Sequence, residues 1–176
     1  MSKPTVHELV FQLAQFLIEH HLTISTAESC TGGMVAAALT ELSGSSAWFE
    51  RGFVTYSNAA KHQHLGVPME LIQTYGAVSL EVAKDMAIGT MNASGSDLAL
   101  AITGVAGPTG GSIEKPVGFV CFGWALKQKG HIKADSKGVF LLSPQEIITD
   151  ATRSKVRELA VHYSLSGMME RLQKSF

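Results

Sequence analysis

The segment LTISTAESCTGGMVAAALTEL, residues 22–42, passes from the pattern of a strand to that of a helix within a few residues. Its first residues are rich in β-branched side chains and predict a strand over residues 22–26. After a turn with Gly32 and Gly33, the alanine-rich remainder predicts a largely buried helix that begins at residue 31 or 32 and ends near the SGSS run. In an open α/β fold, such a turn lies at the carboxyl edge of the sheet, where ligands bind. The segment therefore predicts a candidate site at this turn.

The segments around this unit continue to alternate between the two patterns. Upstream, Thr5 and Glu8 form a T-x-x-E capping box ahead of apolar residues at helical spacing, which predicts a helix over residues 5–20. Downstream, apolar runs and cap residues predict further elements, namely strands over 47–57 and 97–103 and helices over 58–65, from Pro68 and over 80–94.

The C-terminal part begins with the longest irregular segment, residues 104–116, which has four glycines and two prolines. Strands are predicted over 117–126 and 132–142, joined by a turn at KQKG. This order of elements predicts one domain over residues 1–176, with an α/β fold in which a mixed sheet lies in a three-layer α/β/α sandwich. The last element is a helix from Pro144 to Lys174, whose candidate core residues are Ile147, Ile148, Ala151, Val156, Leu159, Ala160 and Tyr163.

The composition is that of a soluble globular protein. Hydrophobic residues make up 45% of the chain, and 14 basic residues balance 15 acidic ones, so we expect no nucleic-acid partner. No apolar run approaches the roughly 18 residues of a membrane span, and the N-terminus lacks the pattern of a secretory signal, which predicts a cytoplasmic protein without membrane contact. Cys30 and Cys121 suit a reducing compartment, predict no disulfide and are too few for a zinc site.

Ser29 lies in the turn after the first strand, where two roles fit it. The N–H groups of Cys30, Thr31, Gly32 and Gly33 are expected to be free at a helix start, where they could hold a phosphate or the oxyanion of an acyl transfer. Alternatively, Ser29 or Thr31 caps the helix, and the glycines let it pack closely on the sheet. Cys30 is the weaker candidate nucleophile, because its side chain is expected to point into the core.

Tyr56 and Lys61 supply a candidate base for Ser29. Tyr56 ends the second predicted strand, and Lys61 lies in the first turn of the next helix. A lysine desolvated there would have a lowered pKa and could take the serine proton, with Tyr56 orienting it or relaying the proton. The alternative is a solvated Lys61 beside a Tyr56 that only packs at the strand end.

Thr103 and Gly104 end a central strand at the same edge of the predicted sheet as Ser29. The loop after them includes Gly107, and its glycines let the backbone approach a ligand closely. Loops of this length inside a domain are more often functional than idle. Because no Gly-Lys-Ser/Thr follows and the loop does not open a helix, contact with a phosphate or sugar is expected, but not hydrolysis of a nucleoside triphosphate.

Four motifs in this order resemble the CinA C-terminal domain family: TAESCTGG (26–33), GSSAWFERGFVTYSNAAK (44–61), GAVS (76–79) and AITGVAGPTGGSIEKPVGFVCFG (101–123). The resemblance covers residues 5–142 and, more loosely, the last helix. It implies a mixed, mostly parallel five-stranded sheet between helices, of the anticodon-binding-domain-like class. It also implies an amidase that hydrolyses nicotinamide mononucleotide (NMN) to nicotinate mononucleotide and ammonia in pyridine nucleotide recycling, as a homodimer without metal or other cofactor.

The resemblance also implies roles for single residues. Ser29 matches the nucleophile and Lys61 its general base, with Tyr56 beside it. Arg153 and Arg157 keep the spacing of two family arginines, although the glycine of the family's glycine-aspartate-arginine run is missing here. The implied oxyanion and substrate-binding groups are Thr31, Gly32, Gly33, Thr103, Gly104, Gly107 and Arg153.

Two other functional classes fit parts of the sequence. A metal site would need histidines on one face, but His62 and His64 point in different directions on a helix and no H-E-x-x-H occurs, so we expect solvated histidines and no metal. A non-catalytic nucleotide-binding module, or an accessory protein in competence or DNA damage, would use Ser29 as a cap and the glycine-rich loop as a phosphate cradle.

Overall fold

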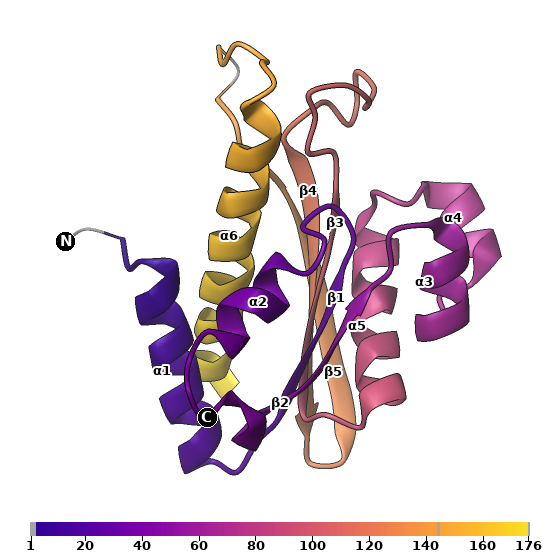
Figure 1. The fold of residues 1–176 in the computed structure, drawn as a ribbon. Coiled ribbons are helices and arrows are strands. Elements are labelled where there is room, and N and C mark those ends of the chain that lie inside the picture. Colours follow the sequence, from indigo (N-terminus) through magenta and orange to yellow (C-terminus); the bar gives the residue numbers. More distant parts are fainter. Residues whose placement is uncertain (1–2, 144, 176) are drawn as a thin grey trace.

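The structure, a computed structural model, describes residues 3–143 and 145–175 as a five-stranded mixed sheet between two layers of helices (Figure 1). β1 is parallel to β2 and β3, whereas β4 is antiparallel to β3 and β5. The predicted α/β/α sandwich with a mixed sheet is therefore confirmed. In the sheet order β2-β1-β3-β4-β5, the strands span Phe49–Val54 (β2), Ile24–Glu28 (β1), Leu98–Gly104 (β3), Phe119–Gln128 (β4) and His131–Phe140 (β5).

The helices divide between the two faces of the sheet (Figure 1). The predicted capping box is present, because the Thr5 side chain accepts from the Glu8 N–H and the Glu8 carboxylate accepts from the Thr5 N–H. One layer contains α1 (Val6–Glu19), α2 (Met34–Thr40) and α6 (Thr152–Ser175), with the short 3-10 helix η1 (Ser45–Ala47) before β2. The other contains α3 (Asn58–Leu65), α4 (Met69–Tyr75) and α5 (Leu80–Ser94). No helix in the described part of the chain is long and apolar enough to cross a membrane.

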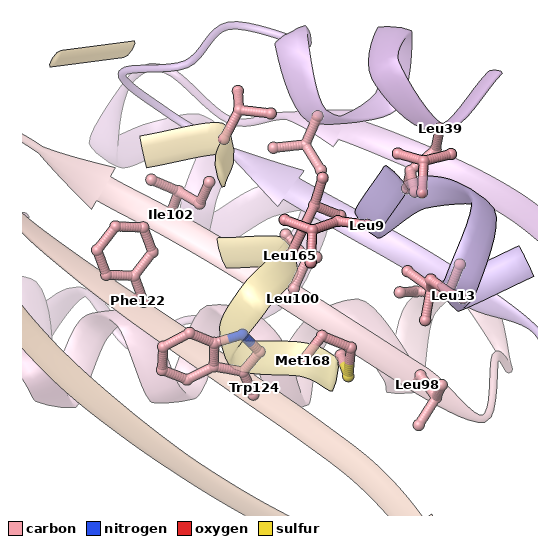
Figure 2. Close-up of a cluster of buried hydrophobic side chains, with 14 of the residues drawn as sticks. Leu9, Leu13, Leu39, Leu98, Leu100, Ile102, Phe122, Trp124, Leu165 and Met168 are labelled. Carbon is pink, nitrogen blue, oxygen red and sulfur yellow. The ribbon is translucent and has the colours of Figure 1, made fainter. Parts of the chain in front are cut away.

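β3 separates two hydrophobic cores, because its side chains alternate between the faces of the sheet. Large residues such as Leu98 and Leu100 pack with α1 and α6, together with Trp124 of β4 (Figure 2). Ala99 and Ala101 lie in the other core, with buried residues of α5. Because alanine is small, α5 can approach the sheet closely on this side.

Gly123 of β4 lies where α5 approaches the sheet, and replacing it should destabilise the fold. A Cβ atom at this position would be 2.0 Å from the carbonyl oxygen of Ala83 in α5. We expect Gly123→Ala to lower the free energy of unfolding in urea by about 1–3 kcal/mol, the usual cost of overpacking. Lys127→Ala, an exposed position on the same strand, is the control and should change it by less than about 0.5 kcal/mol. Equal stability of Gly123→Ala and the wild type would contradict this packing.

The last helix begins later than its sequence pattern predicts. α6 starts at Thr152, and residues 145–151 are not helical, whereas Pro144 lies outside the described residues. Two hydrogen bonds between Thr149 and Thr152 close a turn before the helix. The Thr149 N–H donates to the Thr152 hydroxyl, and the Thr152 N–H donates to the Thr149 carbonyl oxygen. The expectation that Ile147 and Ile148 join the core is wrong, because their side chains are 82% and 42% exposed. Ala151 and Leu159 are exposed as well, whereas Val156 and Ala160 are buried as expected.

Candidate active site

Ser29 directly follows β1, at the edge of the sheet where β1, β2 and β3 all end. Its N–H donates to the Ile102 carbonyl of β3 at 3.0 Å, and the residue is buried. The chain then reverses through Gly32 (φ +60°) and Gly33 (φ +98°), a left-handed conformation that favours glycine. α2 begins only at Met34, later than predicted, because these two glycines do not have helical geometry. β1 likewise ends at Glu28, two residues beyond the predicted end of the strand.

The carboxylate of Glu28 occupies the start of α2. It accepts from the N–H groups of Gly33 at 3.1 Å, Val35 at 3.0 Å and Ala36 at 2.9 Å. The N–H of Gly32 donates to the Ser29 carbonyl. The expectation that the N–H groups of Gly32 and Gly33 are free is therefore wrong.

Two N–H groups of the turn have no acceptor in another residue of the described chain. In residues 3–143 and 145–175, the N–H groups of Cys30 and Thr31 donate to no other residue. Both lie within two residues of the Ser29 hydroxyl, so they are the candidate donors for an oxyanion.

Lys61 reaches Ser29 from the first half of α3. Its Nζ lies 3.1 Å from Ser29 Oγ, 2.8 Å from the Thr55 carbonyl oxygen and 3.4 Å from the Tyr56 carbonyl oxygen. The residue is 1% exposed, and no carboxylate pairs with its ammonium group in the described part of the protein. Burial therefore lowers the pKa of Lys61 to about 8. The alternative of a solvated Lys61 is wrong.

Tyr56 contacts Lys61 only through its main chain. Its side chain is exposed, and its hydroxyl accepts a hydrogen bond from Arg153 at 3.1 Å. Arg153, near the start of α6, also donates to the Gly107 carbonyl oxygen at 3.0 Å. The structure thus brings Tyr56, Gly107 and Arg153 together at the rim of the site. It does not support a phenol that orients Lys61 or relays its proton.

Thr103 and Gly104 end β3 at the same edge of the sheet, as predicted. The Thr103 hydroxyl donates to the Ala77 carbonyl oxygen at 2.8 Å and so fixes the segment that leads into α5. Gly104 allows close packing, because a Cβ atom there would be 2.8 Å from Val120 Cγ2. A Cβ atom at Gly107 would be 2.4 Å from Val117 Cγ1, so this glycine lets the loop fold back on itself.

Cys30 does not have the properties of a nucleophile. Its side chain belongs to the hydrophobic core, and burial raises the pKa of its thiol to about 11. Because the thiolate is the reactive form, this raised pKa disfavours Cys30 as the nucleophile.

Arg157 holds the turn from the side of α6. It donates to the Thr31 carbonyl oxygen at 3.0 Å. Together, Glu28 and Arg157 fix both sides of the turn, and local sequence reasoning assigned neither of them to it. One feature of the sequence points to such a contact: no Ser, Thr, Asp or Asn directly precedes Met34, so a side chain from elsewhere has to cap α2.

A groove of about 920 Å³ lies beside the glycine-rich loop. It is lined by residues 110–113 and 116–118, by Phe140, and by the segment after β5, including Leu142 and Ile148. Neither Ser29 nor Lys61 lines it, so it is a separate surface. Within the described residues, no three His, Cys, Asp or Glu side chains gather in a way that could hold a metal ion.

Comparisons with known proteins identify relatives of this chain. The family model of the CinA C-terminal domain matches residues 6–172. The nicotinamide-nucleotide amidohydrolase PncC of Enterobacter agglomerans is 45% identical over 175 residues, which cover 99% of this chain and 100% of that protein. A CinA-like protein of Chlorobium chlorochromatii is 51% identical over 120 residues, which cover 68% of this chain but only 28% of that longer protein. The crystal structure of a CinA superfamily protein from Enterobacter cloacae matches with a TM-score of 0.86 at 34% identity, over 98% of this chain and 95% of that chain.

Proposed function

Because the chain belongs to the CinA C-terminal domain family, we propose that it is a nicotinamide-nucleotide amidohydrolase, which converts NMN to nicotinate mononucleotide and ammonia in pyridine nucleotide recycling. The observation that carries the proposal is the buried contact of 3.1 Å between Lys61 Nζ and Ser29 Oγ. Relatives named for this activity support the substrate, and the contact supports hydrolysis by an activated serine.

In the proposed reaction, Lys61 is the general base and Ser29 the nucleophile. Since the pKa of Lys61 is lowered to about 8, part of the population is neutral at physiological pH. The neutral amine can donate to the carbonyl oxygens of Thr55 and Tyr56 while its lone pair faces the Ser29 hydroxyl. Lys61 takes the hydroxyl proton as Ser29 Oγ attacks the carboxamide carbon of NMN.

The oxyanion formed by this attack is held by the N–H groups of Cys30 and Thr31, and Gly32 and Gly33 shape the turn. When the intermediate collapses, the C–N bond breaks, and the Lys61 ammonium returns the proton to the leaving nitrogen, which departs as ammonia. Water, deprotonated by Lys61, then hydrolyses the ester on Ser29. The products are nicotinate mononucleotide and free enzyme, so that one water is consumed for each ammonia released.

The rim of the site is proposed to bind the remainder of the substrate. Thr103 and Gly104, at the end of β3, and Gly107, in the loop that follows, form one side of it. Arg153 adds a positive charge there, and its contacts with Tyr56 and the Gly107 carbonyl orient it. An arginine fits the phosphate of a mononucleotide, because its planar N–H groups match phosphate oxygens.

The proposal is tested by incubating the purified protein with NMN and measuring ammonia and nicotinate mononucleotide over time. Equal amounts of both products are expected from the wild type. Binding of NMN without any turnover would instead favour a non-catalytic nucleotide-binding module. The burial of Lys61 argues against that module. If Ser29 were only a helix cap, a lysine buried beside it would cost free energy without serving a purpose.

Self-association is proposed to involve the apolar groove beside the glycine-rich loop. Ile113, Phe140 and Ile147 lie in or next to its lining segments and are 101%, 61% and 82% exposed. Exposed apolar side chains gathered in this way are typical of a contact surface between proteins. Sedimentation equilibrium should give twice the mass of one chain, and Ile113→Asp should shift the protein toward the monomer. A wild type that is monomeric at micromolar concentration would contradict the homodimer.

A cytoplasmic location is also part of the proposal. Cys30 and Cys121 are both buried, free thiols, which is typical of proteins from a reducing compartment.

A further inference from the structure

Glu28 lies next to the nucleophile and fixes the turn that contains it. We propose that Glu28 is a positioning residue for amide hydrolysis, acting through the turn of residues 29–33 rather than on the substrate. The inference rests on the proposed function, because it assigns a task within that reaction.

The side chain of Glu28 closes the turn. The residue is 1% exposed, and its two oxygens accept three N–H groups at the start of α2, from Gly33, Val35 and Ala36. Gly33 has no side chain to cap the helix, so the carboxylate does so from the strand five residues earlier. Such charge-assisted hydrogen bonds are stronger than those between neutral groups. The end of β1 and the start of α2 are therefore tied together on either side of Ser29.

The main chain of Glu28 positions the base. Its carbonyl oxygen accepts from the Thr55 N–H at 2.9 Å, and the Thr55 carbonyl oxygen accepts from Lys61 Nζ at 2.8 Å. Glu28 thus connects to the nucleophile through its side chain and to the base through its main chain. Only the first connection depends on the identity of the side chain.

The carboxylate also selects which N–H groups face a substrate. It engages Gly33, Val35 and Ala36, and the turn that it closes leaves the N–H groups of Cys30 and Thr31 unpaired within the described residues. Loss of the carboxylate would loosen these donors relative to Ser29 Oγ. An oxyanion is bound more tightly than the ground-state carbonyl, so this change should lower kcat more than it raises KM.

The test compares Glu28→Gln and Glu28→Ala with wild type. Glu28→Gln keeps the length and one acceptor oxygen, and we expect kcat per folded enzyme to fall by about tenfold, against about 100-fold for Glu28→Ala, with KM within about threefold in both. Hydrogen exchange at the N–H groups of Val35 and Ala36 should become at least about tenfold faster. If Glu28→Ala does not fold, Glu28→Gln alone decides.

Glu8→Gln is the matched control, because Glu8 is also a carboxylate that completes a helix cap, at the start of α1. It should leave kcat unchanged. The proposal is overturned if Glu28→Gln and Glu28→Ala keep the wild-type kcat per folded enzyme. It is also overturned if Glu8→Gln lowers kcat as much as Glu28→Gln does.

A second readout separates this proposal from the proposed function. An alkyl fluorophosphonate reacts with an activated serine: Ser29 Oγ bonds to phosphorus, fluoride leaves, and Lys61 takes the hydroxyl proton. If the wild type does not hydrolyse NMN, the proposed substrate is wrong, and the labelling rate then tests Glu28. Labelling slowed about tenfold in Glu28→Gln supports the positioning role, and labelling at the wild-type rate overturns it.

Discussion

Ser29→Ala should lower kcat for NMN hydrolysis by about 10⁴- to 10⁶-fold, the usual loss when a serine hydrolase loses its nucleophile. The substitution removes only the hydroxyl that lies 3.1 Å from Lys61 Nζ, so the fold and the affinity for NMN should change little. Ammonia release under saturating NMN measures kcat, and equilibrium binding of NMN measures the affinity.

Cys30→Ala is the control for Ser29→Ala, because Cys30 is the neighbouring residue and also carries a possible nucleophile. Its thiol has a raised pKa and is buried, so this variant should keep most of the wild-type kcat. An inactive Cys30→Ala together with an active Ser29→Ala would overturn the assignment of the nucleophile.

Lys61→Met should lower kcat by about 10²- to 10⁴-fold, the range that general-base catalysis contributes. Methionine keeps much of the length of the side chain but cannot take the proton from Ser29. The control is Tyr56→Phe, which keeps the main-chain carbonyl near Lys61 and loses only the bond to Arg153, so its main effect should be on KM. Steady-state kinetics of both variants provide the test. A Lys61→Met enzyme with nearly wild-type kcat would contradict the role of the base.

The pH dependence follows from the lowered pKa of Lys61. Since the neutral amine is the base, wild-type kcat/KM should rise through about pH 8 and level off above it. The free energy of unfolding should also depend on pH through Lys61. Between a pKa of about 8 in the folded state and the ordinary value of 10.5, Lys61 binds more protons in the unfolded chain, so the contribution of Lys61 to stability rises with pH across this window. Lys61→Met should lack that rise and be at least as stable as wild type below pH 8.

The sequence predicted the parts of the site that depend on strand order. Ser29 follows one strand and Lys61 lies just after the next, and parallel neighbours bring such positions to one edge of the sheet. Their contact spans 32 residues of sequence, so local patterns alone left Lys61 open as a surface residue. The residues suggested Lys61 as a base for Ser29, the family resemblance favoured this role over a solvated lysine, and the sheet register explains the contact.

The contributions of Glu28 and Arg157 were not predictable from local patterns. A glutamate at a strand end has no local signature of a cap that acts five residues later, and Arg157 reaches Thr31 from 126 residues away. For residues 145–151, a local pattern predicted a helix that the structure does not have. The spacing of the apolar residues in this segment fits a helix, but the side chains of Ile147 and Ile148 are exposed and do not pack in the core.

The central claim is that Ser29, activated by Lys61, attacks the substrate. The most direct measurement follows alkyl fluorophosphonate labelling and NMN hydrolysis in the same sample, and locates the modified residue by peptide mass spectrometry. We predict that the label is on Ser29, that NMN slows its formation, and that activity falls in proportion to the labelled fraction. Full activity with Ser29 completely labelled, or loss of activity with the label on another residue, would contradict the claim.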